Sequence, residues 1–335
     1  MINSVHHFLW SLALLVCALA IPHPAFSLEL TPFQTFNQSP LVQIYGLPAP
    51  ESGTTVPARR LDTRLSLDIA SNFAVDTKGA EAITLDGETY RTTLAFRYGV
   101  TNNIELGLDI PYIVETGGIF DSPIQWWHHV FNMSQAGRDE APKNRLLFTY
   151  SRNGAERFSI SHGNDGVGDI RLSGGVQLYR EDRPEPLAVA LRASLKLPTG
   201  NSGKFQGSGG TDFALWLSAL DQYEGWGLYG AVGGMTVGKG DVLTDMQRDV
   251  AAFGCFGIGL TPVEWLALKM QLYGNTPFYK GSSIKELSVA SLQWVFGQTV
   301  AFTPDTELDI AVAEDLLALT TSPDFGIHVA LRIRF

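Results

Sequence analysis

The segment Phe325–Phe335 decides the fold, and it reads Phe-Gly-Ile-His-Val-Ala-Leu-Arg-Ile-Arg-Phe. Every odd-numbered position is apolar, whereas the even-numbered positions are small, basic or histidine. This period of two is that of a β-strand with one apolar and one polar face. Because a tilted strand of about 9 to 11 residues spans a bilayer, the segment predicts a closing strand whose apolar face contacts lipid.

The composition agrees with a barrel that contacts lipid. Of the 335 residues, 45% are hydrophobic and 17% are charged, and after residue 27 no run approaches the roughly 18 apolar residues of a membrane helix. Alternation dilutes the lipid-facing residues of a barrel, although a large soluble β protein also has such a composition. The net charge of -10 and the scattered lysines and arginines argue against a nucleic-acid partner.

The first 27 residues have the pattern of a secretory signal peptide. An apolar core at 8–20 is followed by prolines and then by Ala25-Phe26-Ser27, which predicts cleavage after Ser27. Cys17 lies within the apolar core and does not follow a small residue, so lipidation is disfavoured. Removal of this segment leaves Cys255 alone and excludes an intramolecular disulfide.

Residues 28–60 form an irregular leader, because five prolines prevent a regular strand or helix. The sequence leaves two places for this leader. It could run outside the barrel, or it could fold into the lumen as a plug. The barrel domain is then expected over 61–335.

Twelve alternating segments follow the leader, starting with Leu61–Phe73 and ending with the closing strand. Their connections alternate between short ones, at 101–103, 181–185, 221–225, 261–264 and 303–306, and longer ones, at 74–88, 112–165, 198–212, 238–248, 274–286 and 314–324. Short periplasmic turns and long outer loops are typical of outer-membrane barrels, and closure removes unpaired strand edges. The pattern predicts an all-β, transmembrane antiparallel β-barrel of about 12 strands. Ten or fourteen strands stay open, because 146–160 could add a hairpin, which we place above the membrane.

The polar faces of these strands carry many charges. The tight turn after Val100 places Arg97 diagonally opposite Glu105 and Asp109 on the inner wall. Charges in such number require partners or water. The lumen is therefore either a narrow pathway whose selectivity depends on Arg97, Glu105 and Asp109, or a salt-bridged wall without traffic.

The long connection 112–165 contains a short predicted helix, because Ser122 is a suitable N-cap and Pro123 suits the first turn. The helix carries Trp126 and Trp127, which we expect to contact lipid headgroups or ligand at the barrel mouth, as an interfacial anchor or as a lid.

Other polar motifs in this connection predict no chemistry. The adjacent His128 and His129 point apart on a helix, so no metal site is expected. Ser161, His162 and Asp165 are too close in sequence to form a nucleophile, base and orienter. No catalytic residue and no cofactor is predicted.

Several segments resemble a known family. They are Asn37–Leu41, Tyr45–Pro48, the Trp-rich connection with Gly137–Asp139, and Gly166–Ile170. They are similar to the bacterial domain-of-unknown-function family 3187 of outer-membrane β-barrel proteins, and the final Phe335 resembles the ends of such barrels. The resemblance implies the outer membrane of a Gram-negative cell and supplies no catalytic residue.

Together these observations predict a monomeric, porin-like outer-membrane barrel that acts as a pore-like transporter for a small solute, with outer-membrane lipid around it. Two alternatives stay open. One is an outer-membrane enzyme acting on lipid or peptide at the barrel rim, and the other is a structural or surface-binding barrel.

Overall fold

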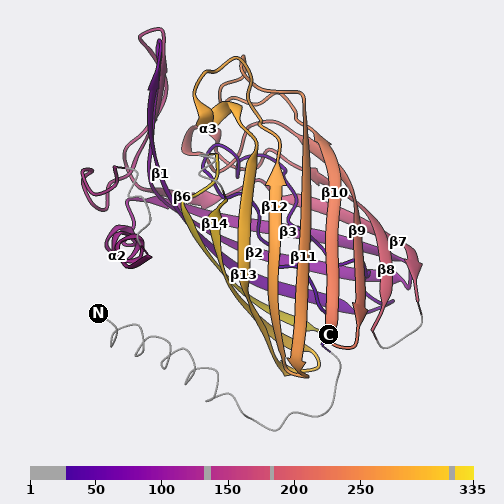
Figure 1. The fold of residues 1–335 in the computed structure, drawn as a ribbon. Helices are drawn as coiled ribbons and strands as arrows, with labels where there is room; N and C mark the ends of the chain where they lie inside the picture. Colours follow the sequence, from indigo (N-terminus) through magenta and orange to yellow (C-terminus); the bar gives the residue numbers. More distant parts are fainter. Residues whose placement is uncertain (1–27, 132–136, 182–184, 317–320) are drawn as a thin grey trace.

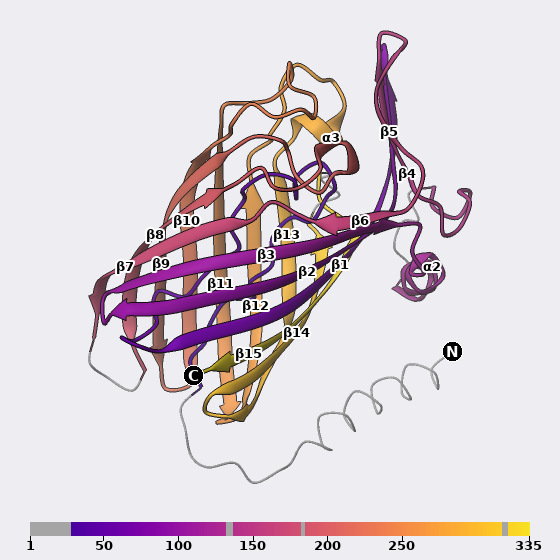
Figure 2. The same ribbon diagram turned by 180° about the vertical axis from the view of Figure 1, so that it is seen from behind.

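The computed structural model describes residues 28–131, 137–181, 185–316 and 321–335. The predicted signal peptide 1–27, with Cys17, lies outside the described residues. Within them, twelve strands form a closed antiparallel barrel (Figures 1 and 2). The strands of the ring are β1 (Leu61–Lys78), β2 (Glu81–Thr101), β3 (Ile104–Thr116), β7 (Arg171–Arg180), β8 (Leu187–Lys196), β9 (Asp212–Tyr223), β10 (Trp226–Thr236), β11 (Val250–Val263), β12 (Leu266–Asn275), β13 (Ser291–Thr303), β14 (Thr306–Asp315) and β15 (Phe325–Arg334). This architecture confirms the predicted fold.

Strand β15 closes the ring by pairing with β1, with Asp68 opposite His328 and Leu65 opposite Leu331. Residues that alternate between apolar and polar in the sequence point to opposite faces of their strand. In β9, for example, Phe213 and Leu215 are exposed on the outside, whereas Trp216 is buried inside. Among the described helices, none is both long enough and apolar enough to cross a membrane.

The first connection differs from the prediction. A long loop was expected at 74–88, but β1 and β2 continue as strands to Lys78 and Glu81 and turn through Gly79, whose φ is +62°. Beyond the ring, β2 pairs with β4 (Leu147–Arg152), which pairs with β5 (Ala155–Ile160). These two strands stay outside the ring, as expected for the optional hairpin above the membrane, so the ring has twelve strands in the described residues and not fourteen.

Two irregularities have local causes. Strand β6 (Asn164–Val167) continues the line of β7 along β3, and the break between them faces Pro111, which has no N–H to donate. The strand predicted from Leu287 begins only at Ser291, because Leu287 belongs to the short helix α3 (Lys285–Ser288). The residues before Ser291 therefore belong to the connection and not to the strand.

The leader runs inside the ring from the end with short turns, here called the short-turn end, to the opposite, long-loop end and back (Figure 1). Leu28 O accepts a hydrogen bond from Gln222 at the short-turn end, and Leu41 O accepts one from Tyr279 at the long-loop end. The leader then returns to Ala58, which bridges Gly99.

Inward-facing glutamine side chains of the barrel form hydrogen bonds to the backbone of the leader, which pairs with no described strand over this stretch. Gln271 accepts from the backbone N–H of Phe33 and donates to its carbonyl oxygen, both at 3.0 Å. Gln222 does the same for Leu30 N–H and Leu28 O, at 3.0 and 2.9 Å. These backbone polar groups of the leader are thus satisfied without regular secondary structure.

An apolar cluster fills the long-loop end of the lumen. The leader contributes Ile44, Tyr45 and Leu47, and the surrounding loops and the β4 hairpin contribute side chains such as Phe148 and Phe278. Tyr45 stacks on Phe278 with ring centroids 4.5 Å apart. Beside this cluster, Lys196 forms a buried charged group with Asp169 and Asp212 and donates to Ile44 O. Further charged side chains line the lumen toward the short-turn end.

Candidate functional site

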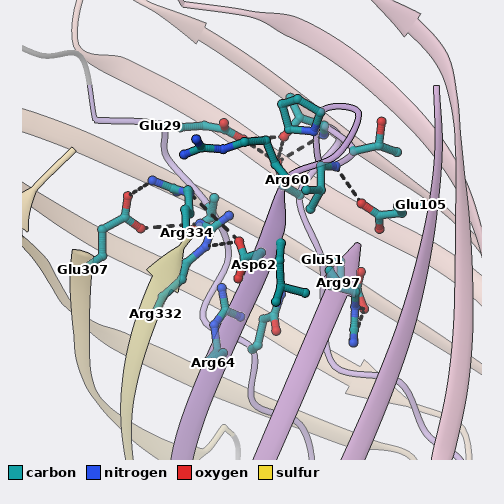
Figure 3. A pocket seen from close by; sticks show the side chains of 18 of the residues that line it. Glu29, Glu51, Arg60, Asp62, Arg64, Arg97, Glu105, Glu307, Arg332 and Arg334 are labelled. Carbon is teal, nitrogen blue, oxygen red and sulfur yellow. Dashed lines mark hydrogen bonds and ion pairs between the residues drawn. The ribbon is translucent and has the colours of Figure 1, made fainter. Parts of the chain in front are cut away.

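A charged cavity of about 300 Å³ lies at the short-turn end, between the leader and the inner wall (Figure 3). The exposed residues Pro57, Arg60, Arg180 and Pro304 form its rim, so it opens to the surface at this end. Its charged lining comes from the leader and from several strands of the ring: Glu29, Glu51, Asp62, Arg64, Arg97, Glu105, Arg192, Glu307, Arg332 and Arg334. A cavity of this size can hold a small molecule.

The structure brings two of the three predicted lumen residues into direct contact. Arg97 Nη1 lies 2.6 Å from Asp109 Oδ1, as the register of β2 and β3 predicts. The same guanidinium reaches the leader, because Arg97 Nη2 lies 2.8 Å from Glu51 Oε1. Glu51 is therefore a member of the site that the strand pattern did not reveal.

Glu105 has a different partner from the one expected. Its carboxylate pairs with Arg192 of β8, and it accepts a hydrogen bond from Val56 N–H of the leader at 2.8 Å. Gly175 of β7 lies opposite both Glu105 and Arg192 in the sheet. Because glycine has no side chain, the two charged groups can meet across the intervening strand; a Cβ at Gly175 would lie 3.0 Å from Glu105 Cγ.

Glu51 joins these two groups into one network, since its other oxygen lies 2.6 Å from Arg192 Nη1. Burial alone would raise the pKa of the Glu51 carboxyl, but the adjacent Arg97 and Arg192 guanidinium groups outweigh it and lower the pKa to about 2. The carboxylate is thus ionised across the physiological range. One charged side chain of the leader is held by two arginines of the wall.

A second acidic residue of the leader lies nearer the opening. Burial opposes ionisation of Glu29, but hydrogen bonds from Thr54 and Ser52 and the nearby charges of Arg332 and Arg334 lower the pKa of its carboxyl. On the adjacent wall, Arg332 and Arg334 bind Asp62 and Glu307 (Figure 3).

A smaller cavity of about 40 Å³ continues the charged region toward the middle of the barrel. It shares Glu51, Arg64 and Arg97 with the larger cavity. Its far side is formed by Phe36 of the leader, whose ring lies 5.3 Å from the Arg91 guanidinium. The polar path thus ends at the apolar cluster, and leader residues line both cavities.

The predicted helix forms as α2 (Asp121–Phe131), and it lies beside the barrel, outside its wall (Figures 1 and 2). It begins before the predicted N-cap, because Ser122 lies within its first turn. Arg138 anchors it, at 2.7 Å from Asp121 and 2.8 Å from Asp324. Trp126 is 56% exposed, and among the described residues no side chain of α2 lines either cavity. The side chain of Trp127 lies outside the described part of the structure.

The polar residues near the rim do not assemble a hydrolytic site. Ser161 Oγ lies 3.1 Å from His162 Nδ1, but the side-chain partner of Asp165 is Tyr112. Across the described ranges, no group of three or more His, Cys, Asp or Glu side chains is arranged to hold a metal ion.

A closed twelve-stranded barrel with apolar residues outside and charges in its lumen has the architecture of an outer-membrane channel. The model of the family described as "Protein of unknown function (DUF3187)" matches residues 8–335, and the chain belongs to this family. No curated protein matches the sequence.

Solved structures with the same architecture include the COG4313 outer membrane channel from Pseudomonas putida F1. It is 13% identical, with a TM-score of 0.58, and the alignment covers 86% of this chain and 100% of that chain. The NanC porin is 10% identical with a TM-score of 0.44, covering 82% and 98% of the two chains. The Ralstonia pickettii toluene transporter TbuX is 10% identical with a TM-score of 0.38, covering 92% and 96%. At these identities the likeness concerns the fold, and only the first score is high enough to support it.

Proposed function

We propose that this protein is a pore-like transporter of the outer membrane that passes a small solute through its lumen. The observation that carries the proposal is the charged path of two adjoining cavities inside a closed barrel, open at the short-turn end. One chain closes the ring through β1 and β15, so a monomer suffices for a pore. The short-turn end faces the periplasm in this proposal, since outer-membrane barrels have their long loops outside.

The leader is the plug of this pore. It contributes Glu51 to the charged network and Tyr45 to the apolar cluster at the far end. With both regions occupied, the described conformation is closed, and a solute passes only when the leader moves. The contacts that hold the leader are non-covalent, so displacement needs no chemical change.

Arg97, Glu105 and Asp109 set the charge preference of the opened pore, because they line the cavity wall from which the leader departs. Trp126 has a separate role. Its exposed indole on a helix beside the barrel suits contact with lipid headgroups. We do not assign it to a lid, since the described part of α2 does not line the path.

Single-channel recording in planar bilayers tests the proposal. The intact mature protein should show rare openings or none, whereas a variant lacking residues 28–60 should conduct in discrete steps. Heat-dependent migration on a denaturing gel verifies that both barrels are folded. Folded barrels that stay silent in both forms would refute the pore, and an activity lost on replacement of His162 would favour the rim enzyme.

A further inference from the structure

Three arginines inside the barrel lack a carboxylate partner. Arg64, Arg91 and Arg171 project inward from β1, β2 and β7, and each is at least nine-tenths buried. Within the described residues, none of them forms an ion pair or a hydrogen bond with an Asp or Glu side chain. Arg171 donates to Leu47 O at 2.9 Å, Arg91 has a long contact of 3.4 Å with Gln43 O, and both guanidinium groups lie over the ring of Phe36.

The carboxylates that line the same two cavities are already engaged. The larger cavity contains Glu29, held by Ser52 and Thr54, and four acids paired with other arginines. In the smaller cavity, Asp68 pairs with His328, Asp109 with Arg97, and Asp169 with Lys196. In the described conformation, each of these acids therefore has a direct partner other than Arg64.

Of the three arginines, Arg64 has the fewest contacts with polar groups of the described residues. It is 5% exposed, it lines both cavities at their junction, and its Nε and Nη1 have no hydrogen-bond partner among the described residues. Nearby carboxylates such as Asp62 and Asp309 attract this guanidinium without bonding to it. Buried donors without a hydrogen-bond partner are nevertheless costly, and buried polar groups are nearly always satisfied. Its place at the junction means that a ligand entering from the short-turn end meets this group within the cavity (Figure 3).

We infer that the larger cavity is a binding site for a small organic carboxylate, with Arg64 as the group that recognises the carboxylate. A guanidinium matches a carboxylate with two parallel hydrogen bonds. The rest of the ligand meets a mixed lining, in which the apolar side chains of Leu28, Val56 and Ala95 lie among polar groups. A volume of about 300 Å³ accommodates more than an inorganic ion.

This inference deepens the proposed function by naming the class of solute, and that consequence rests on the proposed function. The binding site itself does not depend on the proposed function, because binding can be measured in detergent, where no transport takes place. A protein that binds the carboxylate but never conducts would keep the site and lose the pore. A protein that conducts but does not bind would keep the pore and lose the site.

The probe is butyrate, compared with butyramide, its neutral analogue of similar size and shape. Ligand-observed NMR on the folded full-length mature protein in micelles, at millimolar ligand concentration, measures both affinities. Wild type should bind butyrate and not butyramide. Arg64→Gln should weaken butyrate binding roughly 10- to 100-fold, the effect of losing hydrogen bonds to a charged group.

Arg59→Gln is the matched control, because Arg59 is exposed at the same end of the barrel and does not line the cavity; it should leave the affinity unchanged. Arg64→Gln removes no partner from any carboxylate, so the barrel should fold, and heat-dependent gel migration checks this. Equal binding of butyrate and butyramide, an unchanged affinity in Arg64→Gln, or no butyrate binding by the folded wild type would each overturn the inference.

Discussion

Replacing Glu51 with glutamine removes the charge through which the leader is held by two arginines of the wall. The carboxylate oxygens of Glu51 lie 2.8 Å from Arg97 Nη2 and 2.6 Å from Arg192 Nη1. Glutamine keeps the size of the side chain and one acceptor, so the variant alters charge with little change in packing. If the leader is the plug, this substitution should favour its undocked state.

The magnitude follows from the partners that remain. Removing one member of a buried ion pair costs about 3 to 5 kcal/mol when the other member is left uncompensated. Here Arg97 keeps Asp109 and Arg192 keeps Glu105, so we expect a smaller loss, about 2 to 3 kcal/mol, in the range for hydrogen bonds to charged groups. That corresponds to a roughly 30- to 150-fold rise in the ratio of undocked to docked leader.

Two measurements report this ratio. Single-channel recording gives the open probability, and limited chymotrypsin digestion with mass spectrometry gives the rate of cleavage after Phe33 and Tyr45, both now buried. Asp305→Asn is the control. Asp305 pairs with Arg60 at the same end of the barrel, but its side chain is 54% exposed, so its loss should cost under about 1 kcal/mol. If Glu51→Gln matches wild type in both assays, the leader is not held by this network and the argument fails.

Three further predictions concern the leader and the lumen. Gly259→Val should loosen the start of the leader, because a Cβ at this glycine would lie 2.7 Å from Leu30 Cδ2. Chymotryptic cleavage after Phe33 should therefore be faster. Gly254→Ala, on the same strand but away from the leader, should leave the cleavage rate unchanged. Acidification from pH 7 to 5 should leave the open probability unchanged: the pKa of Glu51 is about 2, so its stabilising effect is complete above its ordinary pKa of 4.5 and is lost only as the pH falls toward 2. In the leader-deleted pore, Arg97→Ala should shift the reversal potential toward cation preference, because it leaves Asp109 without its arginine; an unchanged reversal potential would remove Arg97 from the selectivity assignment.

The strands could be predicted because their signal is local. Alternation at a period of two identifies each strand from its own residues, and the tight turn after Val100 fixes the register that brings Arg97 to Asp109. The extension of β1 to Lys78 and the start of β2 at Glu81 were not predicted. The start of β2 pairs with β4 outside the ring, and the end of β1 pairs with β2, so these residues extend beyond the ring whose pattern identified the strands.

The site required information that no local pattern contains. Glu105 meets Arg192 across a third strand, and the only trace of this in the sequence is a small residue, Gly175, at the intervening position. Glu51 lies in a proline-rich segment without periodicity, and its arginines follow 46 and 141 residues later in the chain. Sequence spacing therefore predicted a charged wall but not the leader that completes it.

The way in which the leader completes the wall also explains why three arginines remain unpaired. The leader brings one carboxylate, that of Glu51, into the arginine network, and elsewhere it offers the lumen mainly backbone carbonyls, such as Leu47 O to Arg171. A carbonyl satisfies a donor but does not neutralise a cation. A barrel evolved only to be sealed would gain nothing from keeping Arg64 buried without a partner, because an apolar residue in its place would cost less. A buried guanidinium that lacks a directly bonded carboxylate and lies beside an open cavity is instead an arrangement in which an anion from solution can bind, and this links the charged lumen to transport more closely than to a static salt-bridged wall.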